Sequence, residues 1–277
     1  MSDVVLTTDG IPIRFDAIGN GDRALVFVHG WSCDRTYWRH QVDAFVDSYR
    51  VVTIDLAGQG ESGVGRASWT MPAFGADVVA VIDALGLLDV VLIGHSMGGD
   101  VIVEAALTLG DRVGGLVWVD TYRYLTEPSS EEDVDAFVAP FRRDFVGTTR
   151  SFVRGMFRPE TDRDLVDWIV ADMSSAPPDV AVEALNYAVA NEGPVMTALP
   201  RLAIPIVAIN PDDRPTDAAS LGKFGIETII ASGVGHFLML EHAKQFNRLL
   251  SEVLIKWPSP GRSLNPRALP EPQSRSG

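Results

Sequence analysis

The stretch VLIGHSMGGD, residues 91–100, decides the fold because it joins an apolar run to a glycine-rich turn around one serine. Its centre, GHSMG at positions 94–98, fits the pattern G-x-S-x-G, between a strand-like run and a helical pattern over residues 97–109. Such a turn holds the serine in a strained backbone conformation and exposes its hydroxyl at a helix N-terminus. The plainer reading is a turn that only packs helix against strand. The strand–turn–helix context favours the first reading, with Ser96 as a nucleophile.

Short apolar runs rich in β-branched residues alternate along the chain with amphipathic helical patterns. Runs of this length are typical of strands that are buried on both faces of a parallel sheet. They occupy residues 24–28, 50–54, 90–93, 115–119, 205–209 and 227–231. Residues 3–8 and 12–18 flank the turn signal Asp9-Gly10 and predict a hairpin. The fold class is therefore α/β, with a mostly parallel, doubly wound sheet whose active loops follow the carboxyl ends of the strands.

Residues 121–200 interrupt this alternation, since they show only helical, aromatic-rich patterns. We expect them to form a helical cap over one end of a core made by residues 1–120 and 201–257. Some cap aromatics should form the cap's own core, and the others should line an apolar pocket. Residues 258–277 are rich in proline, serine and glycine, which predicts a disordered tail.

The composition argues against several classes of protein, among them nucleic-acid-binding and membrane-spanning proteins. A net charge of −14 leaves no basic surface for a nucleic-acid partner. The single cysteine, Cys33, excludes an internal disulfide and a multi-thiolate metal site. Residues 1–10 lack the pattern of a signal peptide, and no apolar run reaches the length of about 18 residues that a membrane span needs. We expect a cytoplasmic protein, and the sequence leaves its oligomeric state open.

A nucleophilic serine needs a base, and the chain has five histidines. His236 lies in ASGVGHFLML (231–240), directly after the last predicted strand, so its loop opens at the same sheet edge as Ser96. His29 is expected to order the turn that follows it, and His95 to point to the other side of its own tight turn. Position and chain order therefore favour His236 as the base.

The base in turn needs a carboxylate that fixes the imidazole tautomer and stabilises the imidazolium. This residue should lie at a strand end between the serine and the histidine in the chain. IPIVAINPDDRPTD (204–217) offers Asp212, Asp213 and Asp217, and WVDTY (118–122) offers Asp120. The residues alone leave this choice open.

Several motifs together resemble those of the α/β-hydrolase fold superfamily, in its serine esterase or lipase-like members with a helical cap. The resemblance runs from residue 3 to about residue 257. The motifs are HGW (29–31), DLAGQGES (55–62), GHSMGG (94–99), NPDD (210–213) and GVGHF (233–237).

The resemblance implies a catalytic triad in the chain order serine, acid, histidine. In that family the acid commonly lies three residues past a glycine that ends a strand. Here Asn210 replaces the glycine, which makes Asp213 the best match and Asp212 its near rival. Some family members take the acid from the preceding strand, so Asp120 stays an alternative.

The same resemblance completes the expected site. Ser96 and His236 match the family's nucleophile and base, and the backbone N–H groups of Trp31 and Met97 match its oxyanion hole. A serine at position 96 excludes the epoxide and halide chemistry of members with an aspartate nucleophile. No metal and no cofactor are implied.

These residues suit acyl transfer, so we expect hydrolysis of carboxylic esters of small to medium apolar molecules through an acyl-enzyme. Thioesters and lactones are variants of the same chemistry. Two alternatives stay open. One is other chemistry of the same triad, namely carbon–carbon bond hydrolysis, cyanohydrin cleavage or peracid formation. The other is a small-molecule receptor that keeps the triad without using it for turnover.

Overall fold

An eight-stranded, mostly parallel sheet forms the centre of the protein, seen in a computed structural model that describes residues 3–257. The tail predicted for residues 258–277 lies outside the described residues. The strands are β1 (Asp3–Leu6), β2 (Pro12–Ile18), β3 (Ala24–Val28), β4 (Arg50–Ile54), β5 (Val90–His95), β6 (Val113–Val119), β7 (Ile206–Pro211) and β8 (Ile226–Ala231). Their order is β1-β2-β4-β3-β5-β6-β7-β8, and β2 pairs antiparallel with β1 and β4, whereas the other pairs are parallel. The predicted hairpin and the predicted parallel strands are confirmed.

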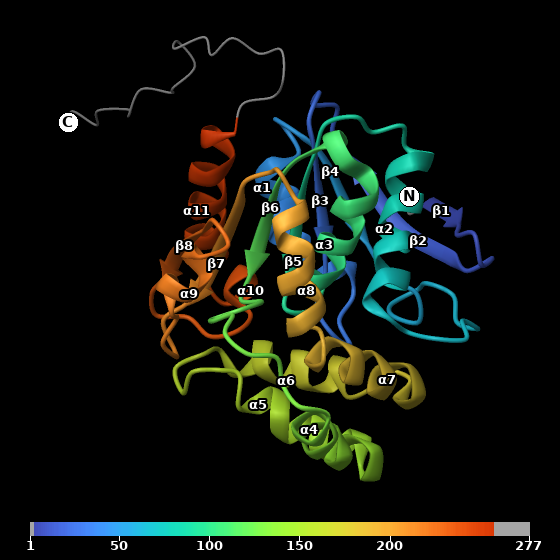
Figure 1. Ribbon diagram of the computed structural model, residues 1–277, viewed down its shortest axis with the longest axis vertical. Helices are drawn as coiled ribbons and strands as arrows, with labels where there is room; N and C mark the ends of the chain where they lie inside the picture. Colours follow the sequence, from blue (N-terminus) through green and yellow to red (C-terminus); the bar gives the residue numbers. More distant parts are fainter. Residues whose placement is uncertain (1–2, 258–277) are drawn as a thin grey trace.

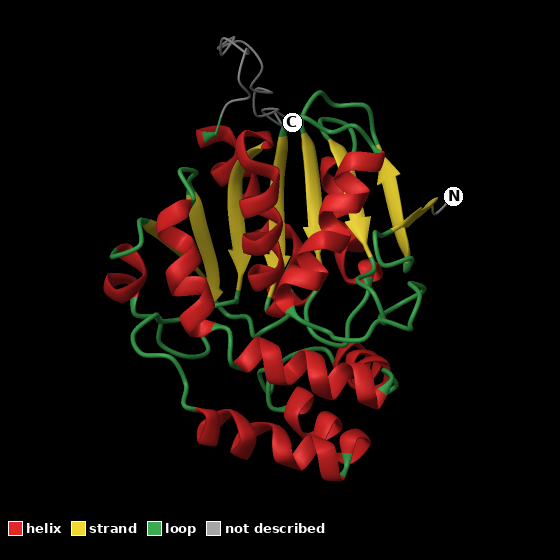
Figure 2. Ribbon diagram, turned by 45° about the vertical axis from the view of Figure 1, so that its right-hand side comes forward, coloured by secondary structure: helices red, strands yellow, loops and turns green. Residues whose placement is uncertain are grey.

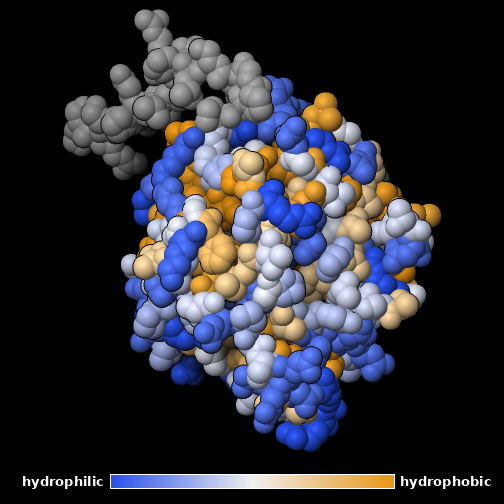
Figure 3. Space-filling model, in the orientation of Figure 1, coloured by the Kyte–Doolittle hydropathy of each residue, from blue (hydrophilic) through white to orange (hydrophobic). Residues whose placement is uncertain are grey.

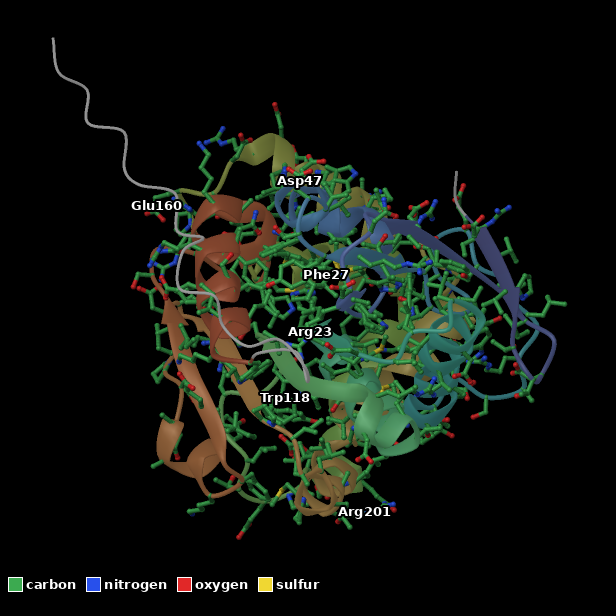
Figure 4. All side chains as sticks on the ribbon, turned by 90° about the horizontal axis from the view of Figure 1, so that it is seen from above. Arg23, Phe27, Asp47, Trp118, Glu160 and Arg201 are labelled. Carbon is green, nitrogen blue, oxygen red and sulfur yellow. The ribbon has the colours of Figure 1, made fainter. Side chains whose placement is uncertain are left out.

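The central strands are apolar throughout because both faces of the sheet are covered. Every residue of β3 is buried, and its neighbours β4 and β5 pair with it over its whole length. Phe27 and Trp118 lie in the interior, whereas Glu160 lies at the periphery (Figure 4). In β1, at the sheet edge, most residues are exposed. Burial on two faces explains why these strands read as continuous apolar runs.

Helices cover the two faces of the sheet (Figure 1). On one face α2 (Met71–Ala84) packs against α3 (Met97–Leu109), and on the other α1 (Arg39–Phe45) contacts α11 (Ala243–Lys256). Helix α2 begins where the Thr70 side chain accepts a hydrogen bond from Ala73 N–H and so caps the helix N-terminus. The short helices of the core are η1 (Arg35–Trp38), η2 (Gly110–Arg112), α9 (Ala218–Gly222) and α10 (Leu238–Glu241).

A helical insertion joins β6 to β7 and lies at the carboxyl ends of the parallel strands (Figure 2). Its helices are α4 (Glu131–Arg143), α5 (Phe145–Arg154), α6 (Arg163–Met173), α7 (Pro178–Val189) and α8 (Glu192–Ala198), followed by η3 (Leu199–Arg201). Buried apolar residues of its helices, such as Val138, Val153 and Ile169, belong to one hydrophobic core that is continuous with that of the sheet, while the outer surface at this end is mostly hydrophilic (Figure 3). Helix α8 packs against α3. The predicted helical insertion is confirmed, and we call α4–α8 the cap.

None of the helices within residues 3–257 is both long enough and apolar enough to cross a membrane.

Candidate active site

Ser96 sits at the sharp turn between β5 and α3. Its backbone has φ +52° and ψ −123°, a conformation that residues with side chains rarely adopt, and its N–H donates to the Val119 carbonyl (2.9 Å). A Cβ atom at Gly94 would lie 2.3 Å from the Gly98 carbonyl oxygen, and one at Gly98 would lie 2.5 Å from the Val28 carbonyl oxygen. Only glycine fits at both positions. The turn leaves Ser96 partly exposed while its neighbours in the chain are buried.

A cavity of about 630 Å³ lies between this turn and the cap. Ser96, Asp120 and His236 contribute to its wall from the core, and Phe152 and Leu185 contribute from the cap. The structure therefore brings the predicted nucleophile and base to one cavity. Because the cap closes over the strand ends, this space is shaped by residues from both parts of the chain.

His236 and Asp120 form a buried pair at this cavity. The distance from His236 Nδ1 to Asp120 Oδ2 is 2.6 Å, and the two residues are 8% and 5% exposed. Burial by itself raises the pKa of Asp120. The hydrogen bond from His236 and the nearby Arg123 charge outweigh this effect and hold that pKa below its ordinary value. An ionised Asp120 accepts the Nδ1 proton, which leaves Nε2 of the neutral imidazole free to accept one.

The predicted pairing of His236 with Asp213 is wrong. Asp213 Oδ1 instead lies 2.6 Å from Arg123 Nη2, and its Oδ2 lies 3.3 Å from Arg214 Nε. The same Arg123 nitrogen lies 2.9 Å from Asp120 Oδ1. Arg123 thus pairs with both aspartates, and Asp213 bonds to arginines and not to the imidazole. The aspartate that reaches His236 is the alternative at the end of β6.

The other two aspartates considered as the acid have different partners. Asp217 caps the N-terminus of α9 through hydrogen bonds from the backbone N–H groups of Ala219 (3.1 Å) and Ser220 (3.0 Å). Asp212 accepts a hydrogen bond from Arg158, a cap residue, at 2.5 Å. Neither aspartate bonds to His236.

A segment of the cap after α5 is bonded to the loop that carries His236. His236 N–H donates to the Met156 carbonyl (3.1 Å), and Arg158 Nε donates to the Val234 carbonyl (2.9 Å). With the Arg158–Asp212 ion pair, these bonds tie the segment to the carboxyl ends of β7 and β8. The cap therefore supports the histidine loop as well as lining the cavity.

Two further histidines are buried near the site. His29 Nε2 accepts a hydrogen bond from Leu56 N–H (3.1 Å), and its Nδ1 lies 2.8 Å from the Gly30 carbonyl, so it orders the loops after β3 and β4. His95 Nε2 lies 3.0 Å from the His236 carbonyl oxygen. Burial and the neighbouring His236 lower the pKa of His95 well below its ordinary value. The ring is therefore neutral and donates to the histidine loop, a contact that no local sequence signal reveals.

The two residues expected to form the oxyanion hole also border the cavity. Trp31 and Met97 both line it, and a Cβ atom at Gly30 would lie 3.2 Å from Ser96 Cβ, so the HGW loop passes beside the serine. The Trp31 side chain turns toward the cap, where its Nε1 donates to the Ala181 carbonyl of α7 (2.6 Å). This bond links the loop to the cap.

Within residues 3–257, no three histidine, cysteine, aspartate or glutamate side chains gather in a group that could hold a metal ion.

Comparison with known proteins shows the family of the chain. The alpha/beta hydrolase family model matches residues 25–249. The chain belongs to the alpha/beta hydrolase family. That span includes the serine turn, both members of the His236–Asp120 pair and the whole cap.

The chain is also similar to individual proteins whose names give different activities. A thermophilic esterase from Thermogutta terrifontis superposes with a TM-score of 0.79 at 27% identity, over 92% of this chain and 98% of that one. 3-Oxoadipate enol-lactonase 2 of Acinetobacter baylyi is 24% identical over 91% of this chain and 96% of its own. A third relative is the dihydrolipoyllysine-residue acetyltransferase component of the acetoin cleaving system of Cupriavidus necator. It is 34% identical over 38% of this chain, and the matched part spans only 28% of that protein's length.

Proposed function

We propose that the protein hydrolyses carboxylic esters through an acyl-enzyme formed on Ser96. The observation that carries this proposal is the 2.6 Å contact between His236 and Asp120 on the wall of the cavity that Ser96 also lines. A serine turn, a buried imidazole and an ionised carboxylate at one cavity supply the groups that acyl transfer needs.

Each residue has a definite role in this reaction. Ser96 Oγ attacks the carbonyl carbon while Nε2 of His236 takes the serine proton, and Asp120 stabilises the resulting imidazolium. The oxyanion accepts hydrogen bonds from the backbone N–H groups of Trp31 and Met97. The imidazolium then protonates the departing alcohol, and water, activated by the same imidazole, releases the acid from Ser96.

The substrate class is proposed from the cavity and the relatives. A volume of about 630 Å³ with aromatic and aliphatic cap residues on its wall suits esters of small to medium size. The esterase that superposes on this chain supports the ester assignment, and the enol-lactonase extends the same acyl chemistry to lactones.

The test is covalent labelling with a fluorophosphonate, which reacts with activated serines. Intact mass spectrometry should show one adduct, together with loss of hydrolysis of short p-nitrophenyl esters. Ser96→Ala should abolish both the adduct and the hydrolysis of these esters. Ser151→Ala, which removes another serine from the cavity wall, should keep the adduct. Labelling of Ser96→Ala to the wild-type extent would contradict the proposal.

A further inference from the structure

A second carboxyl group, that of Asp100, lies in the wall of the same cavity. Asp100 follows Ser96 by four residues in the first turn of α3 and is only 4% exposed. Its Oδ1 accepts hydrogen bonds from Tyr122 Oη (2.6 Å) and Asn191 Nδ2 (2.8 Å). No donor in residues 3–257 bonds to its Oδ2. Asp100 Oδ2 is not one of the fully buried polar atoms that lack a partner, so a donor on a molecule in the cavity can reach it.

Glu192, the first residue of α8, adds a second carboxyl group to this part of the wall. Its Oε2 accepts hydrogen bonds from the backbone N–H (2.9 Å) and Oγ (3.1 Å) of Ser129. Among the described residues, neither Asp100 nor Glu192 has an ion pair. This part of the wall therefore carries the charge of Glu192, and that of Asp100 whenever Asp100 is ionised, with no cation to balance it.

Other charged residues of the cavity wall are already paired. Arg123 and Arg214 line the cavity, and each lies within ion-pair distance of Asp213. Arg123 also neutralises Asp120. A cation entering the cavity therefore finds its unbalanced partner at Asp100 and Glu192 and not beside the triad.

The raised pKa of Asp100 indicates that the protein alone stabilises the ionised form of this carboxyl group poorly. Burial raises the pKa of Asp100 to about 7, even though the hydrogen bonds from Tyr122 and Asn191 oppose the shift. The negative charges of Glu104 and Glu192 raise it further. A bound cation would favour the ionised carboxylate, since an opposite charge at short range stabilises it.

We propose that Asp100 and Glu192 bind a protonated amino group of the substrate, so that the enzyme prefers esters that carry an amine. The inference rests on the proposed ester hydrolysis at Ser96. Asp100 lies in the first turn of the helix that Ser96 caps, and both residues line the same cavity, which places the amine a short alkyl chain from the reacting carbonyl. Leu185, Ala188 and Val189 of α7 line the cavity and provide apolar contacts for such a chain.

The first experiment compares matched ester pairs. Each pair consists of a dimethylamino ester and its isostere with CH in place of the nitrogen. One pair has this group on the acyl chain of a p-nitrophenyl ester, and the other has it on the alcohol of an acetate. A tertiary amine is protonated near neutral pH, and it cannot form an amide by reacting with its own ester group. The measured quantity is the ratio of kcat/KM for the amine over its isostere.

We expect the amine to be favoured in at least one pair. Asp100→Asn should lower the ratio by roughly ten- to a hundredfold, the range for a hydrogen bond between charged groups. Glu192→Gln should lower it less, because Glu192 is only half-buried. Glu132→Gln makes the same change of charge at an exposed position of α4 and should leave the ratio unchanged. A ratio that is equal in wild type and both cavity variants overturns the inference.

A binding measurement separates failure of the inference from failure of the proposed function. Calorimetry with N,N-dimethylbutylamine should show binding to wild type that weakens at least about tenfold in Asp100→Asn. Ser96-dependent hydrolysis of the hydrocarbon isosteres without amine binding would leave the proposed function intact and sink the inference. Amine binding without Ser96-dependent hydrolysis would refute the ester hydrolysis and, with it, the assignment of the amine to an ester substrate. Urea unfolding of each variant shows that it is folded.

Discussion

At the scale of single residues, Asp120 is held from two sides. His236 Nδ1 lies 2.6 Å from one of its oxygens and Arg123 Nη2 lies 2.9 Å from the other. Asp120→Asn should lower kcat by on the order of 10⁴, by analogy with the serine-protease aspartate, because an amide cannot hold the required imidazole tautomer. Steady-state kinetics on p-nitrophenyl acetate provides the measurement.

Asp213→Asn is the matched control for that variant. Asp213 contacts Arg123 and Arg214 and not His236, so its replacement should reduce kcat by less than about tenfold. If Asp213→Asn were the inactive variant and Asp120→Asn the active one, the acid would come from the loop after β7, as the sequence motif indicated.

Local sequence was sufficient to place Ser96 and His236 but not to choose the acid. The serine turn has a recognisable local motif, with a steric contact between Gly94 and Gly98, whereas Asp120 and Asp213 follow adjacent parallel strands and both satisfy the chain order. The choice between them depends on the direction of one side chain, Arg123, and on a positive φ (+45°) at Asp120. An arginine three residues after a strand-end aspartate is the only visible signal, and it does not say which aspartate it bonds.

At the scale of elements, the loop after β8 depends on contacts from distant segments. Glu241 of α10 accepts hydrogen bonds from the backbone N–H groups of Gly235 (3.0 Å) and Phe237 (3.1 Å), on either side of His236. Its carboxylate also accepts from Thr161 Oγ1 of the cap (2.9 Å). The cap segment and α10 thus hold the histidine loop together.

Arg158→Met tests this support. The change removes the bonds to Asp212 and to the Val234 carbonyl, so the histidine loop should move more freely. We expect kcat to fall several-fold on all esters, acetate included, with little change in KM, since geometry at the base is lost while the pocket keeps its walls.

Arg154→Met is the control, because Arg154 forms an exposed ion pair with Asp167 of α6 and does not bond to the histidine loop. Its kcat should stay at the wild-type level. If Arg158→Met altered the preference among esters and left kcat on acetate unchanged, the segment would act on the pocket alone.

The sequence predicted the helices and strands far better than the contacts between them. Each apolar run became a strand because its pattern reflects burial that the run itself undergoes. The cap helices likewise followed from local periodicity. The contact of residues 156–158 with the histidine loop joins segments about 80 residues apart, and no periodicity within either segment encodes it.

At the scale of the whole molecule, buried carboxyl groups make stability depend on pH. Burial raises the pKa of Asp100 to about 7 and that of Asp77 to about 6, both from an ordinary value of 3.8. The folded protein therefore keeps these protons at pH values where the unfolded chain has lost them. Unfolding then releases protons, so these two groups make the free energy of unfolding fall as pH rises from about 4 to about 7. Asp120, whose pKa is lowered, contributes in the opposite sense and at more acidic pH.

Asp100→Asn isolates one of these contributions. Asparagine does not titrate, so the variant escapes the penalty that grows in wild type between the pKa values of the unfolded and folded states. Loss of the carboxyl's hydrogen bonds destabilises the variant at every pH. Between about pH 5 and about pH 8, however, the free energy of unfolding of the variant should rise relative to that of wild type by on the order of a few kcal/mol. Urea unfolding at both pH values measures the difference, with Glu132→Gln as the control that should show no such trend. A difference between variant and wild type that stays the same at both pH values would mean that Asp100 is already ionised in the folded protein. The cavity would then hold a permanent negative charge at its wall. The hydrogen bonds from Tyr122 and Asn191 would have to be sufficient to stabilise that ionised carboxylate.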